Sequence, residues 1–153
     1  MVVAFIGHSE ITFDDKLRKL IYNHLKKIIE QNKEIEFYLG SYSEFDSQCN
    51  SILRELKKYY ANFKTVFITP YLYPGYSRLE NAKYLYDETL YPPIENAPAR
   101  FAISRRNEWM IDNCDFLFCY VSKSYGGAYR AFRRAVNKKI PYINFAEKEL
   151  KKR

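Results

Sequence analysis

The sequence has no long apolar run, few cysteines and no basic segment before its first apolar run, and each shortage speaks against a class of protein. No apolar run approaches the roughly 18 residues that cross a bilayer, so we expect no membrane partner. The opening residues MVVAFIGHSE have no basic segment and their apolar run stops at Gly7, so we expect no signal peptide. The three cysteines, Cys49, Cys114 and Cys119, are odd in number and predict small buried side chains in a reducing, cytoplasmic compartment.

Histidine and glycine are also scarce, and their spacing excludes familiar sites. His8 and His24 lie far apart, and the cysteines are not spaced as ligands either, so we expect no metal site. None of the five glycines falls in a dinucleotide GxGxxG or a P-loop GxxxxGK[ST] pattern. The sequence therefore speaks against a nicotinamide dehydrogenase and an NTPase, and we expect no bound cofactor.

What the chain does have is the composition and alternation of an α/β protein. Hydrophobic residues make up 47% and charged residues 28%, which is globular. Short apolar runs at 2–6, 35–39, 65–69, 115–121 and 140–145 predict strands. Amphipathic stretches predict helices at 14–30, after Ser43, after Ser104 and after Gly126-Gly127. The prediction is a Rossmann-like three-layer sandwich with a mostly parallel sheet of about five strands, in one domain over residues 1–153.

Tyrosine is the compositional oddity, with 15 residues, six of them between Tyr71 and Tyr91. This stretch, YLYPGYSRLENAKYLYDETLYPP, lacks clean periodicity, so we interpret about 71–99 as an irregular insertion with one or two helical turns. A tyrosine cluster lines a ring-binding pocket or packs as a lid or self-association surface, and the sequence leaves these alternatives, including a homo-oligomer, open.

The net charge of +7 arises in one segment. From Lys123 to Arg153 the chain has ten Lys or Arg against two Glu. Such a cluster contacts phosphate or nucleic acid, or is a solvated helix face with a basic tail, here at about 146–153. Arg130, Arg133 and Arg134 differ from the tail because they follow the glycine pair where a helix is expected to begin.

Glycine follows three of the predicted strands, as Gly7, Gly40 and Gly126. The carboxyl ends of parallel strands meet at one edge, and ligands bind there at the point where the strand order reverses. Glycine lets backbone N–H groups approach an anion, and a following helix N-terminus favours negative charge. We therefore expect the three glycines to border a common cleft, with Ser124 to Gly127 cradling a phosphate.

Three polar positions near these ends have both a functional and a structural interpretation. His8 donates to a phosphate or acts as an acid or base, or its ring bonds the backbone of the turn. Asp46 holds a ribose hydroxyl or offsets a helix dipole. Arg105 and Arg106 bind a phosphate or carboxylate, or they pair with Glu108 or Asp112.

The residues GHS, FYLGSYSEFD and SRRNEWMIDNCDFLFCYVSKSYGGAYRAFRRAV together resemble the SLOG superfamily, and within it the bacterial YpsA-like proteins. The superfamily is named after DprA/Smf and the Lonely-guy proteins. The likeness covers the first strand to the second helix and then residues 100–144. It implies a Rossmann-like fold with a pocket for a nucleotide or nucleotide derivative. Carried onto this sequence, that pocket includes Gly7, His8, Gly40, Ser41, Arg106, Ser124, Gly126 and Gly127.

The chain departs from the hydrolases of that family. Lonely-guy phosphoribohydrolases have a PGGxGTxxE motif whose Glu cleaves the glycosidic bond, and the corresponding position here is Ala131. The usual second glycine after the second strand is Ser41. No catalytic residue can be assigned from the resemblance.

Three functions follow, in this order. The first is a binding module, a sensor or regulator, for a nucleotide or an ADP-ribose-like ligand. The second is an N-glycosidic hydrolase or transferase on nucleoside monophosphates. The third is a single-stranded nucleic-acid binder, which the basic segment favours but no recognised motif supports.

Overall fold

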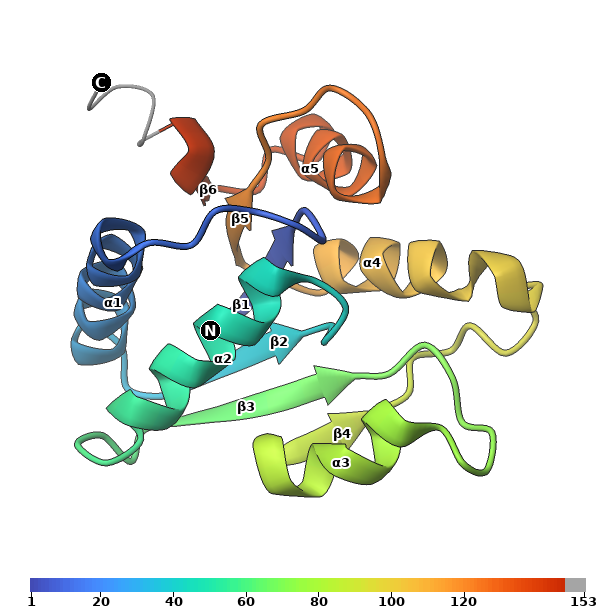
Figure 1. The fold of residues 1–153 in the computed structure, drawn as a ribbon, viewed down its shortest axis with the longest axis horizontal. Helices are drawn as coiled ribbons and strands as arrows, with labels where there is room; N and C mark the ends of the chain where they lie inside the picture. The colour runs from blue at the N-terminus through green and yellow to red at the C-terminus, as the bar shows by residue number, and fades with distance from the viewer. Residues whose placement is uncertain (148–153) are drawn as a thin grey trace.

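The computed structural model describes residues 1–147, and the predicted basic tail beyond Glu147 lies outside the described residues. The elements follow in the order β1 (Val2–Gly7), α1 (Asp15–Glu30), β2 (Ile35–Leu39), α2 (Glu44–Leu56), β3 (Phe63–Ile68), α3 (Ser77–Leu85), β4 (Glu88–Leu90), a 3-10 turn (Ala99–Phe101), α4 (Ala102–Asp112), β5 (Phe116–Tyr120), α5 (Gly127–Asn137) and β6 (Tyr142–Asn144). Figure 1 shows the strands between two groups of helices.

The six strands form one sheet in the order β4-β3-β2-β1-β5-β6, and every neighbouring pair is parallel. The strand order reverses between β1 and β5, whose register pairs Gly7 with Tyr120. The predicted Rossmann-like three-layer class is confirmed, with six strands in place of about five. All strands end on the same edge, so the loops after β1, β2, β3 and β5 gather there.

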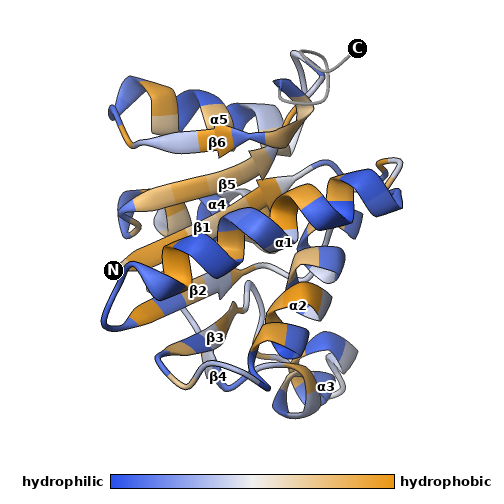
Figure 2. Ribbon diagram, turned by 90° about the vertical axis from the view of Figure 1, so that its left-hand side faces the viewer, coloured by the Kyte–Doolittle hydropathy of each residue, from blue (hydrophilic) through white to orange (hydrophobic). Residues whose placement is uncertain are grey.

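Two apolar clusters cover the two faces of the sheet. Val3 and Phe5 of β1 point into the cluster with α1, α2 and α3, whereas Ala4 and Ile6 point into the cluster with α4 and α5. This alternation is the period of two expected of a strand buried on both faces. In Figure 2 the central strands β1 and β5 are mostly orange, and α1 is banded blue and orange as expected of an amphipathic helix.

The Tyr-rich stretch is more regular than the predicted insertion with one or two helical turns. It contains α3, a helix of nine residues in which only Ala82 is buried, and β4, a strand of three residues that pairs with β3. Because α3 has one buried position and β4 has only three residues, neither element has a hydrophobic periodicity that could be recognised in the sequence. The first turn of α4 also differs, because the helix begins at Ala102 and no side chain caps it. Ser104 therefore lies inside the helix and is not its cap.

Candidate ligand-binding cleft

A cleft of about 340 Å³ lies at the edge where the strands end, between β1 and β5. Its walls come from the loop after β1, the start of α2, the first half of α4 and the loop that leads into α5. This is the position at which open parallel sheets bind ligands. Of the predicted site residues, the cleft brings together Gly7, His8, Asp46, Arg106, Gly126 and Gly127. Gly40, Ser41 and Ser124 are not part of its lining.

A larger hollow of about 970 Å³ lies at the opposite edge of the sheet, near Met1 and Tyr59. Of the two lysines in its lining, Lys33 and Lys64, the latter is already paired with Glu36 and Glu88, each at 3.0 Å. Among the described residues, the lining of this hollow contains neither the N-terminus of a helix nor a buried polar group without a partner. Its larger volume therefore does not make it a better candidate than the cleft.

Gly7 is a glycine because α2 packs directly against it. A Cβ at this position would lie 2.4 Å from the Cβ of Phe45, far inside van der Waals contact. This close approach brings the first turn of α2 to the end of β1. The signal that suggested a phosphate contact at Gly7 therefore has a packing explanation in the structure.

His8 lines the cleft with one ring nitrogen already used. Its Nε2 accepts hydrogen bonds from the backbone N–H groups of Ser122 and Lys123, at 3.0 and 3.2 Å. An acceptor at Nε2 leaves the proton on Nδ1, so the ring is neutral. Burial, and then the charge of Lys123, lower the pKa of His8 below its ordinary value. The ring thus fastens the loop after β5 to the end of β1 and keeps Nδ1–H as a donor.

Arg106 crosses beneath the cleft to the ends of two strands. Its Nη1 donates to the carbonyl oxygens of Gly40 and Ile68, both at 2.8 Å, and its Nε donates to Asn107 at 2.9 Å. The side chain is buried, and its Nη2 donates to no group within the described residues. A Cβ at Gly40 would lie 2.8 Å from this guanidinium, so Gly40 is a glycine to admit Arg106.

Asp46 faces the same network from the first turn of α2. Its Oδ2 accepts from the N–H of Gly40 at 3.1 Å, while its buried Oδ1 has no hydrogen-bond partner in residues 1–147. Burial raises the pKa of Asp46 to about 6, against the opposing attraction of Arg106. A buried carboxylate oxygen without a donor is costly, and such a group in a cleft marks a place where a ligand can supply the missing hydrogen bond.

The N-terminus of α5 forms the opposite wall. Its N-cap is Gly126 at φ 92°, a left-handed conformation that glycine adopts without strain, and no side chain caps the helix. The first turn of α5 contains no acidic residue, and a Cβ at Gly127 would meet Nη2 of Arg130 at 3.9 Å, an ordinary van der Waals contact. The N–H groups of this turn, with Lys123 beside them, suit an anion.

Ser41 and Ser124 lie outside the lining for different reasons. Ser41 has φ 61°, which is left-handed, and its carbonyl accepts from Nε of Arg78 at 2.9 Å. The left-handed backbone explains why a glycine at this place fits the fold at less cost. Ser124 is exposed on the loop before α5.

Sequence reasoning missed several cleft residues. Tyr42 and Ser43 precede α2, and Lys123 and Tyr125 lie on the loop before α5. The N-cap serine was expected, and Ser43 does accept from the N–H of Asp46 at 2.9 Å, but its place in the cleft follows from the topology. The expected acidic partners of the arginine pair are only half right, because Arg105 pairs with Glu108 whereas Asp112 pairs with Arg134 and Lys138.

Two further findings bear on chemistry. Ala131 of α5, at the position of the family's catalytic Glu, is 4% exposed, and its side chain lies in the apolar cluster that α4 and α5 form with the sheet. Within residues 1–147 no group of three His, Cys, Asp or Glu side chains is placed to hold a metal ion.

None of the helices in residues 1–147 is both long and apolar enough to cross a membrane.

No protein-family model matches the sequence, and no curated protein matches it either. Solved structures do. DNA processing protein A (DprA) from Streptococcus pneumoniae is 14% identical with a TM-score of 0.65, over 92% of this chain and 48% of that one. DprA from Helicobacter pylori, described for its single-stranded DNA binding mode, is 15% identical with a TM-score of 0.62, over 93% and 63%.

The molybdenum cofactor carrier protein from Chlamydomonas reinhardtii is 11% identical with a TM-score of 0.53, over 92% of this chain and 73% of that one. The chain spans about half to two thirds of the length of the two DprA chains. At this identity the likeness is one of fold. The chain has the Rossmann-like fold of DprA and of the molybdenum cofactor carrier protein, which is the fold that its resemblance to the SLOG superfamily implies.

Proposed function

We propose that the cleft binds a nucleotide or nucleotide-derived ligand, and that the protein acts through this binding as a sensor or regulator. One observation carries the proposal. In the cleft, the N-terminus of α5 at Gly126 and Gly127 lies near a buried carboxylate oxygen of Asp46. The helix N-terminus has no side-chain cap, and the carboxylate oxygen has no hydrogen-bond donor within the described residues. The first suits a phosphate, and the second suits a hydroxyl group that donates to it.

A ribose phosphate presents both groups on one small framework. Its phosphate oxygens accept from the N–H groups of α5 and from Lys123, while a ribose hydroxyl donates to Oδ1 of Asp46. Nη2 of Arg106 and Nδ1–H of His8 are further donors in the same walls. In this proposal Gly7, Gly40, Ser41 and Ser124 shape the site, and they do so through packing and turns.

The structural neighbours support a binding function of this general kind. The Helicobacter pylori DprA is described as binding single-stranded DNA, and the Chlamydomonas protein as a carrier of the molybdenum cofactor. Both proteins share the fold of this chain over more than nine tenths of its length. The YpsA-like assignment, the cytoplasmic location and a bacterial source remain predictions.

The test pairs a ligand change with a protein change. Calorimetric titration compares adenosine 5′-monophosphate, its 2′-deoxy and 3′-deoxy analogues and adenosine, after a thermal-shift screen of the other nucleoside monophosphates and ADP-ribose. We expect adenosine to bind at least 10-fold more weakly than the monophosphate, because it lacks the group that α5 holds. We expect one deoxy analogue to bind the wild-type protein about 10- to 100-fold more weakly, since it loses a hydrogen bond to a charged group.

The Asp46→Asn variant should reduce that hydroxyl effect to less than about 3-fold, whereas Asp15→Asn, an exposed residue of α1, should leave it unchanged. Absence of binding across the whole panel contradicts the proposal. An equal hydroxyl effect in wild type and Asp46→Asn contradicts the role of Asp46.

A second candidate, binding of a single-stranded nucleic acid, has one observation in its favour. The outer face of α5 forms an open groove of about 600 Å³ lined by Arg130, Arg133 and Lys138 together with Tyr129. Arg133 is exposed and makes no hydrogen bond or ion pair within the described residues. Adjacent basic and aromatic side chains suit a phosphate backbone and stacked bases.

A further inference from the structure

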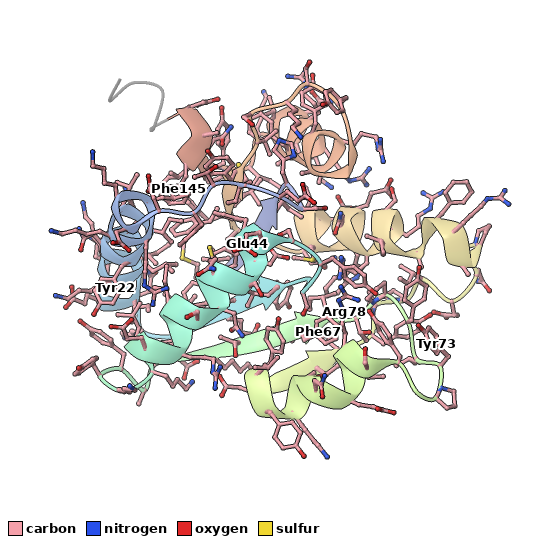
Figure 3. All side chains as sticks on the ribbon, in the orientation of Figure 1. Tyr22, Glu44, Phe67, Tyr73, Arg78 and Phe145 are labelled. Atoms are coloured by element: carbon pink, nitrogen blue, oxygen red, sulfur yellow. The ribbon has the colours of Figure 1, made fainter. Side chains whose placement is uncertain are left out.

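We propose that the exposed ring of Tyr73 stacks the second base of a dinucleotide whose first nucleotide occupies the cleft. This inference rests on the proposed function and names its ligand class. The ring belongs to a cluster of three, Tyr71, Tyr73 and Tyr76, that follows β3 and is called here the tyrosine ledge. Figure 3 labels Tyr73 on this segment, beyond the arrowhead of β3.

The three rings of the tyrosine ledge pack on one another and leave one of them open. The ring centroids of Tyr73 and Tyr76 are 5.0 Å apart, and those of Tyr71 and Tyr76 are 5.5 Å apart with perpendicular planes. Tyr76 is 4% exposed and serves as the base of the cluster, whereas Tyr73 is 56% exposed. Tyr73 therefore presents aromatic surface that no described residue covers.

The ledge is held in place before any ligand arrives. Pro74 and Gly75, with Gly75 at φ 81°, form a turn closed by the N–H of Tyr76 donating to the carbonyl of Tyr73 at 3.3 Å. The hydroxyl of Thr69 donates to the carbonyl of Tyr71 at 2.7 Å, and the Tyr71 hydroxyl donates to the carbonyl of Ala99 at 3.0 Å. A ring displayed on a fixed turn loses little freedom when a base stacks on it.

The ledge is continuous with the cleft through Tyr42. Tyr42 lines the cleft, and its hydroxyl is hydrogen-bonded to the hydroxyl of Tyr76. Burial, and then this hydrogen bond, raise the pKa of Tyr76 above its ordinary value, so its hydroxyl stays a neutral phenol. The two sites are thus connected by one hydrogen-bonded pair of rings.

The charged side chain of Arg78 lies where the cleft meets the tyrosine ledge, beside Tyr42. The guanidinium of Arg78 lies over the Tyr42 ring, 3.9 Å from its centroid, and its Nε is fixed on the carbonyl of Ser41. Arg78 is exposed, and its Nη1 and Nη2 have no hydrogen-bond partner within residues 1–147. A positioned guanidinium between a nucleotide site and an open aromatic ring suits the phosphate that links two nucleosides. This charge favours a dinucleotide over an apolar partner for the ledge.

The experiment measures the affinity of 5′-monophosphates and of the corresponding linear dinucleotides, AMP against pApA and likewise for G, C and U, by calorimetric titration. The variants are Tyr73→Ala and Tyr73→Phe. Tyr59→Ala is the matched control, because Tyr59 is 72% exposed and lies at the opposite edge of the sheet. The affinity of the mononucleotide reports in each variant whether the cleft is intact.

We expect the dinucleotide to bind the wild-type protein about 5- to 150-fold more tightly than the mononucleotide, as one stacked base provides. Tyr73→Ala should reduce this gain at least about 5-fold without changing mononucleotide affinity, while Tyr73→Phe and Tyr59→Ala should retain it. Equal affinities of the two ligands for wild type, or a gain that Tyr73→Ala leaves unchanged, would overturn the inference and leave the proposed function standing. Failure of both ligands to bind wild type would overturn both.

Discussion

Asp46 and Arg106 are the two charged side chains buried in the described part of the chain, and they are not equivalent. Arg106 has donated to two strand-end carbonyls and is largely satisfied. Asp46 has one carboxylate oxygen without a donor. Removing a charge from water without full compensation destabilises the fold, so Asp46 lowers stability unless the proposed ligand supplies the missing donor.

The raised pKa of Asp46 predicts a pH dependence of stability with a definite sign. The unfolded carboxyl has its ordinary pKa of 3.8 and the folded one a pKa of about 6, so between these values the folded state binds the proton that the unfolded state has lost. The contribution of Asp46 to the free energy of unfolding therefore falls as pH rises from about 4 to 6. Relative to Asp46→Asn, wild type should lose on the order of 2 kcal/mol between pH 4 and pH 7.

Urea unfolding of both proteins at several pH values measures this difference, because every other titrating group is common to the two. Parallel curves of free energy against pH would show that Asp46 titrates as it does in the unfolded chain.

At the scale of elements, the N-terminus of α5 is stable without a cap, and this leads to opposite expectations for stability and binding. Gly127→Asp places a carboxylate at the positive end of the helix, three residues from Arg130, where nothing obstructs a Cβ. The free energy of unfolding should be unchanged or rise by about 0.5 kcal/mol. The affinity for AMP should fall more than about 10-fold, because the new charge occupies the region proposed for the phosphate.

Gly127→Ala is the matched variant without charge, and it should bind AMP within about 3-fold of wild type. Thermal unfolding and calorimetric titration of the three proteins give both quantities. If Gly127→Asp binds AMP as well as wild type does, the phosphate does not lie at α5.

The elements that the sequence predicts well are those with strong periodicity. β1, β2, β3 and β5 are apolar on both faces, and α1, α2 and α5 carry a regular apolar stripe, so their residues alone define them. α3 and β4 are held by tertiary contacts, since α3 has one buried residue and β4 has three residues paired to β3. Elements of this kind have no regular alternation of apolar and polar residues, so the sequence alone does not predict them.

The candidate site was predicted in part for the same reason. Parallel strands fix where Gly7 and Gly126 lie relative to each other, so their common cleft follows from the fold. Gly7 admits Phe45, and Gly40 admits Arg106, because α2 and α4 pack against the ends of the strands. A local sequence pattern does not contain this information. Glycine after a strand indicated close approach correctly, but the approaching group is a side chain of the protein.

At the scale of the whole molecule, the net charge of +7 favours any anionic partner, so affinity alone does not separate the cleft from the outer face of α5. The two surfaces differ in kind. The cleft is small and combines donors with two carboxylates, those of Glu10 and Asp46, whereas the α5 groove is open and lined with cations. A mononucleotide bound in the cleft displaces few counterions, and a single strand along α5 displaces one for nearly every phosphate contact.

Salt dependence therefore distinguishes them. For a 12-residue oligothymidylate on α5, three basic contacts predict a slope of log affinity against log salt near −2, since each single-strand contact contributes about −0.7. Arg133→Ala should make that slope shallower by about 0.7 and leave AMP affinity within about 2-fold, because Arg133 is exposed on α5 and is not among the cleft-lining residues. Lys16→Ala, an exposed residue of α1, should change neither quantity. An oligonucleotide slope that Arg133→Ala does not alter would place the strand elsewhere, and an AMP affinity that falls with Arg133→Ala would show that the cleft and the α5 face act as one site.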